Sequence, residues 1–255
     1  MISAGTLNLF ALILMRMSGC IFMNPILGRR NVPTITRVGL TMMLTFAIMS
    51  FSAAAPVPEA ESMFELLVVM FKEFAIGYVV GFIISLFAYA VTFGGEVMDL
   101  QMGLSMTKMY DPASNINLSL FASFFNIMFM LLFFAAGGHI TLVRLLLVSG
   151  NVVPYGQTVF STGIYSTVLD LFCQCVQLAV KFALPIIAIE LLVEVSMGLI
   201  MKAVPQINVF VLNIQIKVFA GFLIIVLLYI PFAEFVENII ARLFETLESV
   251  IPMFG

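Results

Sequence analysis

The sequence predicts an all-α integral membrane protein made of long, broken helices and helical hairpins. Of the 255 residues, 62% are hydrophobic and only 10% are charged, whereas a soluble domain carries about 25% charged residues. The intervals between the apolar runs are too short to hold a separate soluble domain, so we expect residues 1–255 to form one domain. The net charge of −3 gives no reason to expect a nucleic-acid partner.

Six apolar runs can be drawn along the chain, and three of them are too long for one simple crossing. A helix crosses the hydrocarbon core, which is about 30 Å thick, with about 20 residues. The third, fourth and fifth runs exceed this length, so each could tilt, break into a hairpin or extend beyond the bilayer against partner subunits. The runs cover residues 7–27, 38–55, 64–93, 118–147, 165–201 and 209–235.

These runs divide the chain into two parts. The N-terminal part, residues 1–164, holds the first four runs and a polar loop at 104–117. The C-terminal part, residues 165–255, is expected to form a long helical hairpin and an amphipathic tail. From Pro231 onward acidic and apolar residues alternate at helical spacing. This pattern favours a helix lying on a membrane surface or against a partner, with a merely solvated end as the alternative.

Charged and helix-breaking residues interrupt three of the runs. Arg16 lies within the first run, where we expect it to snorkel or to pair inside an assembly. Gly137-Gly138-His139 breaks the fourth run, and its histidine is more often capped or interfacial than part of a proton relay. In the fifth run Pro185 can kink or break the helix.

Two carboxylates follow Pro185 in the same long run. Glu190 and Glu194 lie one helical turn apart and share a face. Carboxylates at membrane depth usually face protein or a water-filled path. The fifth run therefore predicts a conduit or an assembly inside the membrane.

A stripe of small and polar residues runs along the third apolar run. Small residues four apart allow another backbone to approach closely. Ordinary tight helix packing is the favoured interpretation, and an interface with a different subunit is the alternative. The residues of the stripe are Glu73, Gly77, Gly81 and Ser85.

The most polar internal segment, residues 93–117, carries a stripe of methionines. It begins with Gly94-Gly95, which we expect to be flexible, and Asp111-Pro112 should end its helix. Methionine adapts to irregular surfaces. Such a stripe is more often simple packing, but beside charged residues it also fits a deformable plug. The methionines are Met98, Met102, Met106 and Met109.

Nothing in the sequence indicates an enzyme. There is no HExxH motif, no GxSxG elbow and no phosphate-binding loop. The three cysteines fit small apolar filler better than a disulfide framework or a metal site. We therefore expect no catalytic residues, no cofactor and no metal.

Taken together in their order along the chain, these motifs resemble those of the FliR family of flagellar type III export-gate subunits and its injectisome relatives. The resemblance covers nearly the whole chain, and its most specific element is Pro205-Gln206-x-Asn208-Val209-Phe210. Lys202 departs mildly from the family pattern, where arginine is common, and so does Gln215, where a proline often stands. The other matching positions include Arg16, Gly19, Pro25, Pro33, Arg37, Glu73, Gly77, Gly81, Gly94, Gly95, Gln101, Gly103, Asp111, Pro112, Gly137, Ser149, Pro185, Glu194, Gly198 and Lys217.

The resemblance implies a fold and partners. Such proteins look like a fusion of the FliP-like and FliQ-like gate subunits, and one copy joins several copies of each in a closed helical assembly. FlhA-like and FlhB-like export-apparatus proteins would be further partners, and unfolded export substrates would pass through the centre. The location implied is multi-pass in the bacterial inner membrane, at the flagellar basal body.

The resemblance also implies roles for particular residues. The loop 104–117 would project into the pore as a plug. Its sealing and positioning residues would be Met102, Met106, Lys108, Met109, Tyr110 and Asp111. Subunit packing or buried charge would involve Arg16, Glu73, Gly77, Gly81, Glu190, Glu194, Lys202, Pro205, Gln206 and Asn208.

Three other functions stay open at this point. A stand-alone secondary transporter could use Glu190, Glu194 and Asp99 as ion sites near broken helices, although no internal repeat is visible. A purely structural scaffold would have no contact with the pore. The equivalent subunit of a virulence injectisome would share the same motifs.

Overall fold

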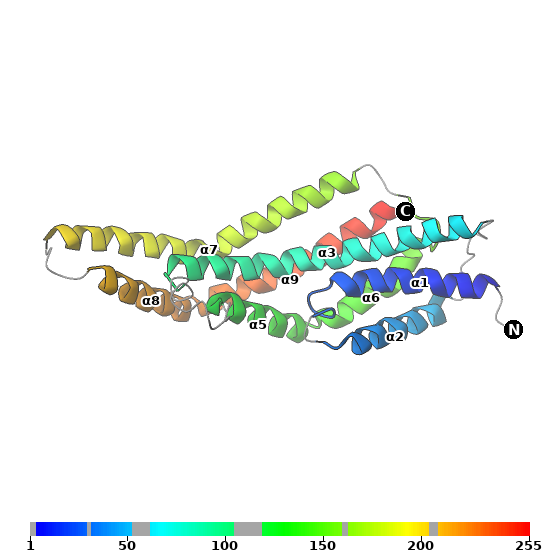
Figure 1. Cartoon of the computed structure of the whole chain (residues 1–255), viewed down its shortest axis with the longest axis horizontal. Helices are drawn as coiled ribbons and strands as arrows, with labels where there is room; N and C mark the ends of the chain where they lie inside the picture. The colour runs from blue at the N-terminus through cyan, green and yellow to red at the C-terminus, as the bar shows by residue number, and fades with distance from the viewer. Residues whose placement is uncertain (1–3, 30–31, 53–61, 105–118, 160–162, 204–208) are drawn as a thin grey trace. The chain divides into compact units, whose positions relative to one another are not determined.

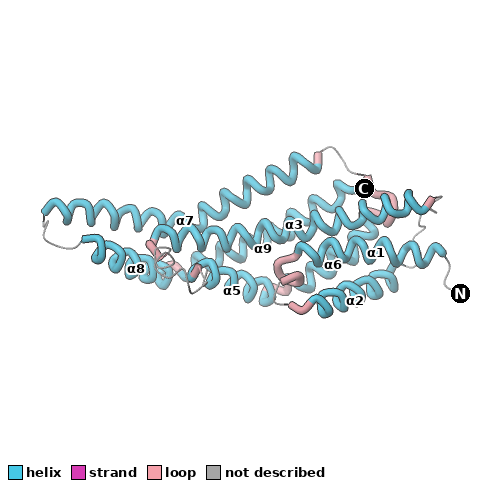
Figure 2. The backbone as a smooth tube through the Cα atoms, viewed as in Figure 1, coloured by secondary structure: helices cyan, strands magenta, loops and turns pink. Residues whose placement is uncertain are grey.

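The fold was taken from a computed structural model that describes residues 4–29, 32–52, 62–104, 119–159, 163–203 and 209–255. Figure 2 shows only helices and loops in these ranges, and no strand occurs in them. The helices, labelled in Figure 1, are α1 (Ala4–Met23), α2 (Thr34–Ser52), α3 (Met63–Gln101), α5 (Leu120–Ala135), α6 (Gly138–Val152), α7 (Ile164–Ala203), α8 (Val209–Leu227), α9 (Tyr229–Val250) and the 3₁₀ helix η1 (Ile251–Phe254).

The predicted fold class is confirmed. Four helices, α1, α2, α3 and α7, are long and apolar enough to cross a membrane. Two bent pairs, α5 with α6 and α8 with α9, pass the same test, which raises the number of candidate spans to six.

The chain folds into two compact units. Unit 1 comprises Met1–Phe87, Phe133–Phe172 and Ile240–Gly255, and unit 2 comprises Ala88–Leu132 and Cys173–Ile239. Helices α3 and α7 each contribute residues to both units.

One helix break was predicted and one was not. Gly137 separates α5 from α6 in the left-handed conformation (φ 70°), and the two helices meet at 65°. No break was predicted in the sixth apolar run, but the helix breaks there between α8 and α9 with a 68° bend. Pro231 explains this second break, because it lacks an N–H to continue the hydrogen bonding and fits the first turn of a new helix.

Two other local expectations were wrong. Gly94 and Gly95 are not a flexible joint but lie inside the continuous helix α3. A Cβ on Gly95 would lie 2.6 Å from Ala122 Cα, so the glycines allow close packing within unit 2. The methionine stripe does not continue as one helix to Asp111, since α3 ends at Gln101 and Gly103 has φ 75°.

Helix α7 runs unbroken through Pro185 for 40 residues. Figure 1 shows that it bends along its length, as a proline inside a helix allows. Pro185 therefore kinks α7 without ending it.

The C-terminal helix α9 is amphipathic, as the alternating tail suggested. Its apolar side chains are buried inside the chain, including Phe232, Val236, Leu243 and Leu247. Its four glutamates are exposed. The apolar face of α9 is thus part of the core and is not free to lie on a membrane.

Aromatic rings fill the centre of unit 2. Phe125, Phe182 and Phe232 contact one another, with ring centroids 4.7–5.4 Å apart. Phe235 stacks on Phe182 at 5.4 Å. Large aromatic side chains contribute much of the burial energy of a core, so this cluster holds α5, α7 and α9 together within the unit.

In unit 1 the small-residue stripe of α3 packs against α1. A Cβ on Gly77 would lie 1.9 Å from the carbonyl oxygen of Arg16, and one on Gly81 would lie 2.6 Å from that of Cys20. At the end of the stripe, the Ser85 hydroxyl donates to the Met23 carbonyl. The stripe therefore joins two helices of the same chain.

Replacing Gly77 with alanine should destabilise unit 1, because the new methyl group would collide with the α1 backbone. We expect Gly77→Ala to lower the thermal midpoint of the detergent-solubilised protein by about 4–10 °C. Gly39→Ala in α2 is the matched control, since a Cβ there meets nothing within 4 Å. An equal midpoint in the two variants would contradict the close helix contact.

Candidate functional site

The candidate site is a buried ion pair in unit 1. Arg16 on α1 and Glu73 on α3 are 1% and 0% exposed, and the guanidinium Nε lies 2.6 Å from the carboxylate Oε2. Removing two charges from water is costly, so a buried pair is stable only when its remaining hydrogen-bonding groups are also satisfied.

The remaining donors of Arg16 reach carbonyl groups near the end of α6. Its Nη1 donates to the Ser149 and Val153 carbonyls at 3.2 and 3.1 Å, and its Nη2 donates to Val153 at 3.1 Å. The guanidinium carbon also lies 4.3 Å from the centre of the Tyr155 ring. Arg16 thus binds the chain that follows α6 by hydrogen bonds and a cation–π contact.

Glu73 holds the same connecting segment from the other side. Its Oε1 accepts hydrogen bonds from the Gly156 amide at 2.9 Å and the Thr158 hydroxyl at 3.0 Å. Next along the chain, the Val159 amide donates to the Phe254 carbonyl at 3.1 Å. We call the Arg16–Glu73 pair together with residues 153–159 the clasp.

The arrangement of the clasp favours a structural role, in which it fixes residues 153–159, over a role in proton transfer. Its charges are shielded from water and already paired. Burial raises the pKa of Tyr155 above its ordinary value of 10, while the nearby Arg16 charge partly opposes this rise in pKa. Tyr155 is therefore neutral at physiological pH, and its ring acts as a wall for the guanidinium.

A second buried carboxylate, Asp99, caps a helix in unit 2. Its oxygens accept hydrogen bonds from the Phe121 amide at 3.1 and 3.2 Å and from the Ser119 hydroxyl. A negative charge at a helix N-terminus is stabilised by free N–H groups and by the helix dipole. The Asp99 carbonyl in turn accepts a hydrogen bond from the Leu104 amide at 3.1 Å.

The two carboxylates of α7 have different environments. Glu194 is exposed and lies 3.3 Å from Lys217 Nζ on α8, an ion pair of a kind that contributes little to stability. Glu190, one turn away, is fully buried. Neither of its oxygens has a hydrogen-bond partner among the described residues.

The other proposed site residues are only partly described. Met102 is fully buried and packs against Gly221. Lys202 is exposed in the last turn of α7, and His139 is exposed beside Phe134. Within the described ranges no group of three metal-binding side chains occurs. The residues outside the described ranges are Met106, Lys108, Met109, Tyr110, Asp111, Pro205, Gln206 and Asn208.

Sequence reasoning missed the loop half of the clasp. It singled out Arg16 and Glu73 but did not connect them, and it gave no role to Tyr155 or Thr158. Arg16 is 57 residues from Glu73 and 137 from Val153. The interrupted run near Gly137 was the only available signal that the chain turns back in this region.

Comparisons with known proteins agree over nearly the whole chain. Residues 7–243 match the family described as "Bacterial export proteins, family 1". The chain is 31% identical over 245 residues to the flagellar biosynthetic protein FliR of Escherichia coli K12, covering 96% of this chain and 93% of that protein. It is 26% identical over 253 residues to FliR of Bacillus subtilis 168, covering 96% and 95%.

A relative with a different name also matches. The surface presentation of antigens protein SpaR of Shigella sonnei is 26% identical over 204 residues, covering 79% of this chain and 77% of that protein.

Removing one partner of the clasp should destabilise the protein more than removing an exposed ion pair. We expect Arg16→Met to cost about 3–5 kcal/mol, because Glu73 would be left as a buried charge without its cation. Proteolysis within residues 153–159 should become faster. Glu194→Gln, which removes an exposed pair, should cost less than about 1 kcal/mol. Thermal midpoints and cleavage rates of the purified variants measure both effects.

The double variant Arg16→Met/Glu73→Met separates charge from packing. It should recover part of the loss, because two apolar side chains leave no buried charge. If the double variant were as unstable as Arg16→Met, lost packing and not an unpaired carboxylate would explain the effect.

Proposed function

We propose that this chain forms part of the wall of a protein-conducting gate. The chain belongs to the bacterial export proteins, family 1, and is a FliR-type component of the flagellar type III export apparatus. It is a multi-pass protein of the inner membrane and not an enzyme. Unfolded flagellar proteins would cross the membrane through the gate.

The observation that carries this proposal is the exposed surface of α7. At about 1.5 Å per residue, its 40 residues extend about 60 Å, which is twice the thickness of the hydrocarbon core. Only 17% of its most apolar stretch is buried within the chain, against 67% for α3. Lipid can cover only about half of this length, and we propose that partner subunits cover the apolar side chains of the rest.

Large apolar side chains continue along the uncovered part of α7. Leu184, Leu191, Leu192, Val195 and Leu199 are each more than half exposed. This pattern favours a helix packed among the helices of partner subunits. FliP-like and FliQ-like subunits are the proposed neighbours, with FlhA-like and FlhB-like proteins in the same apparatus.

The plug role of residues 104–117 is part of the same proposal. Most of this segment lies outside the described residues, but Leu104 and Ser119, which are described, both form hydrogen bonds with Asp99. There the Leu104 amide donates to the Asp99 carbonyl, and the Ser119 hydroxyl donates to the Asp99 carboxylate. In the plug that we propose, Met106, Met109 and Tyr110 seal the pore, and Lys108 and Asp111 position the segment.

The transporter alternative has less support. Two of its three candidate residues are already engaged, since Asp99 serves as a helix cap and Glu194 is paired with Lys217. The third, Glu190, is buried and has no hydrogen-bond partner among the described residues. The injectisome alternative rests on the similarity to SpaR. Complementation of a motility-deficient strain would separate flagellar from virulence use.

Co-purification tests membership of an assembly. The tagged chain, extracted from its native membrane, should be recovered with FliP-like and FliQ-like subunits in one large complex by native mass spectrometry. Leu192→Asn should reduce recovery of these partners without reducing the yield of the chain. Ser196→Asn, on an already polar exposed position of α7, is the matched control. Recovery of the wild-type chain as a folded monomer would contradict the proposal.

Deletion of residues 104–117 tests the plug. The assembled gate, reconstituted in vesicles, should leak ions faster when the loop is absent, because its seal is lost. Replacement of the same residues by a glycine–serine linker of equal length controls for chain connectivity and should also leak. Unchanged leakage in both variants would rule out the plug role, and crosslinking of the loop to a translocating substrate would rule out a pure scaffold.

A further inference from the structure

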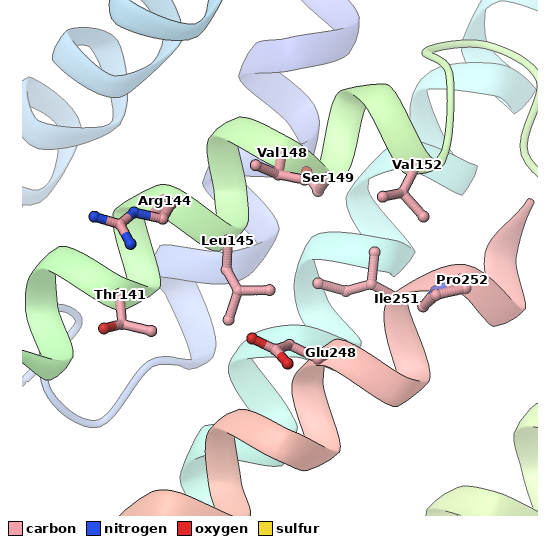
Figure 3. Close-up of a pocket in the computed structure, with 9 residues that line it drawn as sticks. All are labelled: Thr141, Arg144, Leu145, Val148, Ser149, Val152, Glu248, Ile251 and Pro252. Carbon is pink, nitrogen blue, oxygen red and sulfur yellow. The ribbon is translucent and has the colours of Figure 1, made fainter.

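Two surfaces of the chain carry polar side chains that neither the clasp nor the apolar surface of α7 uses. The first is the groove between α6 and the end of α9 with η1 (Figure 3). There Leu145 stands between Arg144 and Glu248, and the Arg144 guanidinium points away from the Glu248 carboxylate. These charges do not converge on one ligand. The second surface lies on the first half of α7, before Pro185, and its pattern is regular.

The first half of α7 has three faces. Each face consists of side chains spaced three or four residues apart, which places them on one side of a helix. The buried face is formed by Leu171, Cys175, Leu178 and Phe182. The exposed apolar face is formed by Leu169, Phe172, Val176 and Val180. The third face, which we call the polar stripe, is exposed and is formed by Asp170, Gln174, Gln177 and Lys181.

A helix divided in this way borders three different surroundings. The buried face packs into the core, where Phe182 contacts Phe125 and Phe232. The side chains of the exposed apolar face are each between 41% and 51% exposed, and they suit lipid or a partner helix. The polar stripe needs surroundings of another kind.

Lipid does not suit the polar stripe. Its end residues, Asp170 and Lys181, lie about 16 Å apart along the helix axis. Both are exposed, and neither forms an ion pair among the described residues. Against hydrocarbon these charges, and the Gln174 and Gln177 amides between them, would lose their hydrogen-bond partners, which is costly.

A closely packed partner helix suits the polar stripe poorly as well. Helices in membranes approach closely where small residues face the partner, as Gly77 and Gly81 do in the contact of α3 with α1. The polar stripe contains no small residue, and a protein cover would have to supply a partner for every charge and amide. Water satisfies all of these groups at once.

The polar stripe ends at the kink of α7. The positions that continue its spacing beyond Pro185 are exposed but apolar, namely Ala188, Leu192, Val195 and Leu199. The large side chains among them are those that partner subunits are proposed to cover. The change of polarity at Pro185 therefore separates a part of α7 that protein encloses from a part that faces water.

We propose that the polar stripe lines the aqueous path of the gate and contacts the backbone of the unfolded chain that crosses it. This inference rests on the proposed function and assigns one face of the gate wall. A glutamine amide both donates and accepts hydrogen bonds, and each non-proline residue of an extended chain offers one N–H and one C=O. Gln174 and Gln177 can therefore bind export substrates without reading their sequence.

The charges of the polar stripe fit a path for varied substrates. Asp170 and Lys181 carry opposite charges, so the net charge of the stripe is zero. A path lined in this way neither excludes acidic segments of a substrate nor retains them, and the same holds for basic segments.

Thiol accessibility in the assembled complex tests this assignment. The complex, purified with its partner subunits, is placed in nanodiscs, where both sides can be reached. Gln174→Cys and Gln177→Cys should react with a charged methanethiosulfonate reagent about tenfold faster than Val176→Cys and Val180→Cys, because the reactive thiolate forms in water. All four variants carry Cys173→Ala, which removes the exposed native thiol.

The two other native cysteines, Cys20 and Cys175, are buried and remain in every variant. A chain with Cys173→Ala alone measures their background reaction. Equal rates at the glutamine and valine positions of an intact complex would overturn this inference and leave the gate proposal standing. If the wild-type chain were recovered without its partners, both would be contradicted.

A substrate arrested in the gate separates the inner path from outer water. A flagellar protein fused to a domain that cannot unfold should slow the reaction at Gln174→Cys and Gln177→Cys severalfold, because its chain covers the polar stripe. The reaction at Val176→Cys and Val180→Cys should not change. Fast labelling of the glutamine positions that the arrested substrate does not slow would overturn the assignment to the path.

Export itself tests the backbone contact without cysteine variants. Gln174→Leu/Gln177→Leu should lower the export of flagellar proteins severalfold while the complex is recovered at the wild-type yield. Gln174→Asn/Gln177→Asn, which keeps both amides, should retain export. Equal export by the two double variants would overturn the contact with substrate, and so would a photocrosslinker at position 177 that captures a partner subunit instead of the arrested substrate.

Discussion

The ion pair between Arg16 and Glu73 connects the helices of unit 1 to the chain that follows α6. A guanidinium presents five donors in a fixed plane, so one arginine can bind a carboxylate and two carbonyls at once. Here the carboxylate comes from α3 and the carbonyls from Ser149 and Val153. Because a charge buried in apolar surroundings is costly, every element that supplies a partner is held in one arrangement.

Close packing of backbones makes this ion pair possible. Gly77, one turn after Glu73, allows the carbonyl of Arg16 to approach α3 more closely than any side chain would permit. The same contact places the guanidinium beside the carboxylate. Loss of either feature would therefore weaken the other. The clasp and the glycine stripe are best regarded as one device that sets the distance between α1 and α3.

The outer surface obeys a different constraint. In a bilayer, lipid covers apolar side chains over about 30 Å, and any apolar helix that extends further needs protein around it. Helix α7 exceeds this length and is largely uncovered, whereas α9 turns its apolar side inward and exposes four glutamates. The chain thus has surfaces suited to other helices and a surface suited to water. Such a combination is expected of a subunit in a membrane assembly.

The sequence by itself determined the all-α class, the overlong runs, the break at Gly137 and the small-residue stripe of α3. Each of these depends on residues within a few turns of one another, where spacing and glycine content act directly. Only the tertiary structure decided that Glu73 pairs with Arg16, that Asp99 caps α5 and that Gly94 and Gly95 are points of contact instead of flexible joints. The reason is physical: a buried polar group must find its partner in space, and that partner can lie more than a hundred residues away in a segment with no periodic pattern.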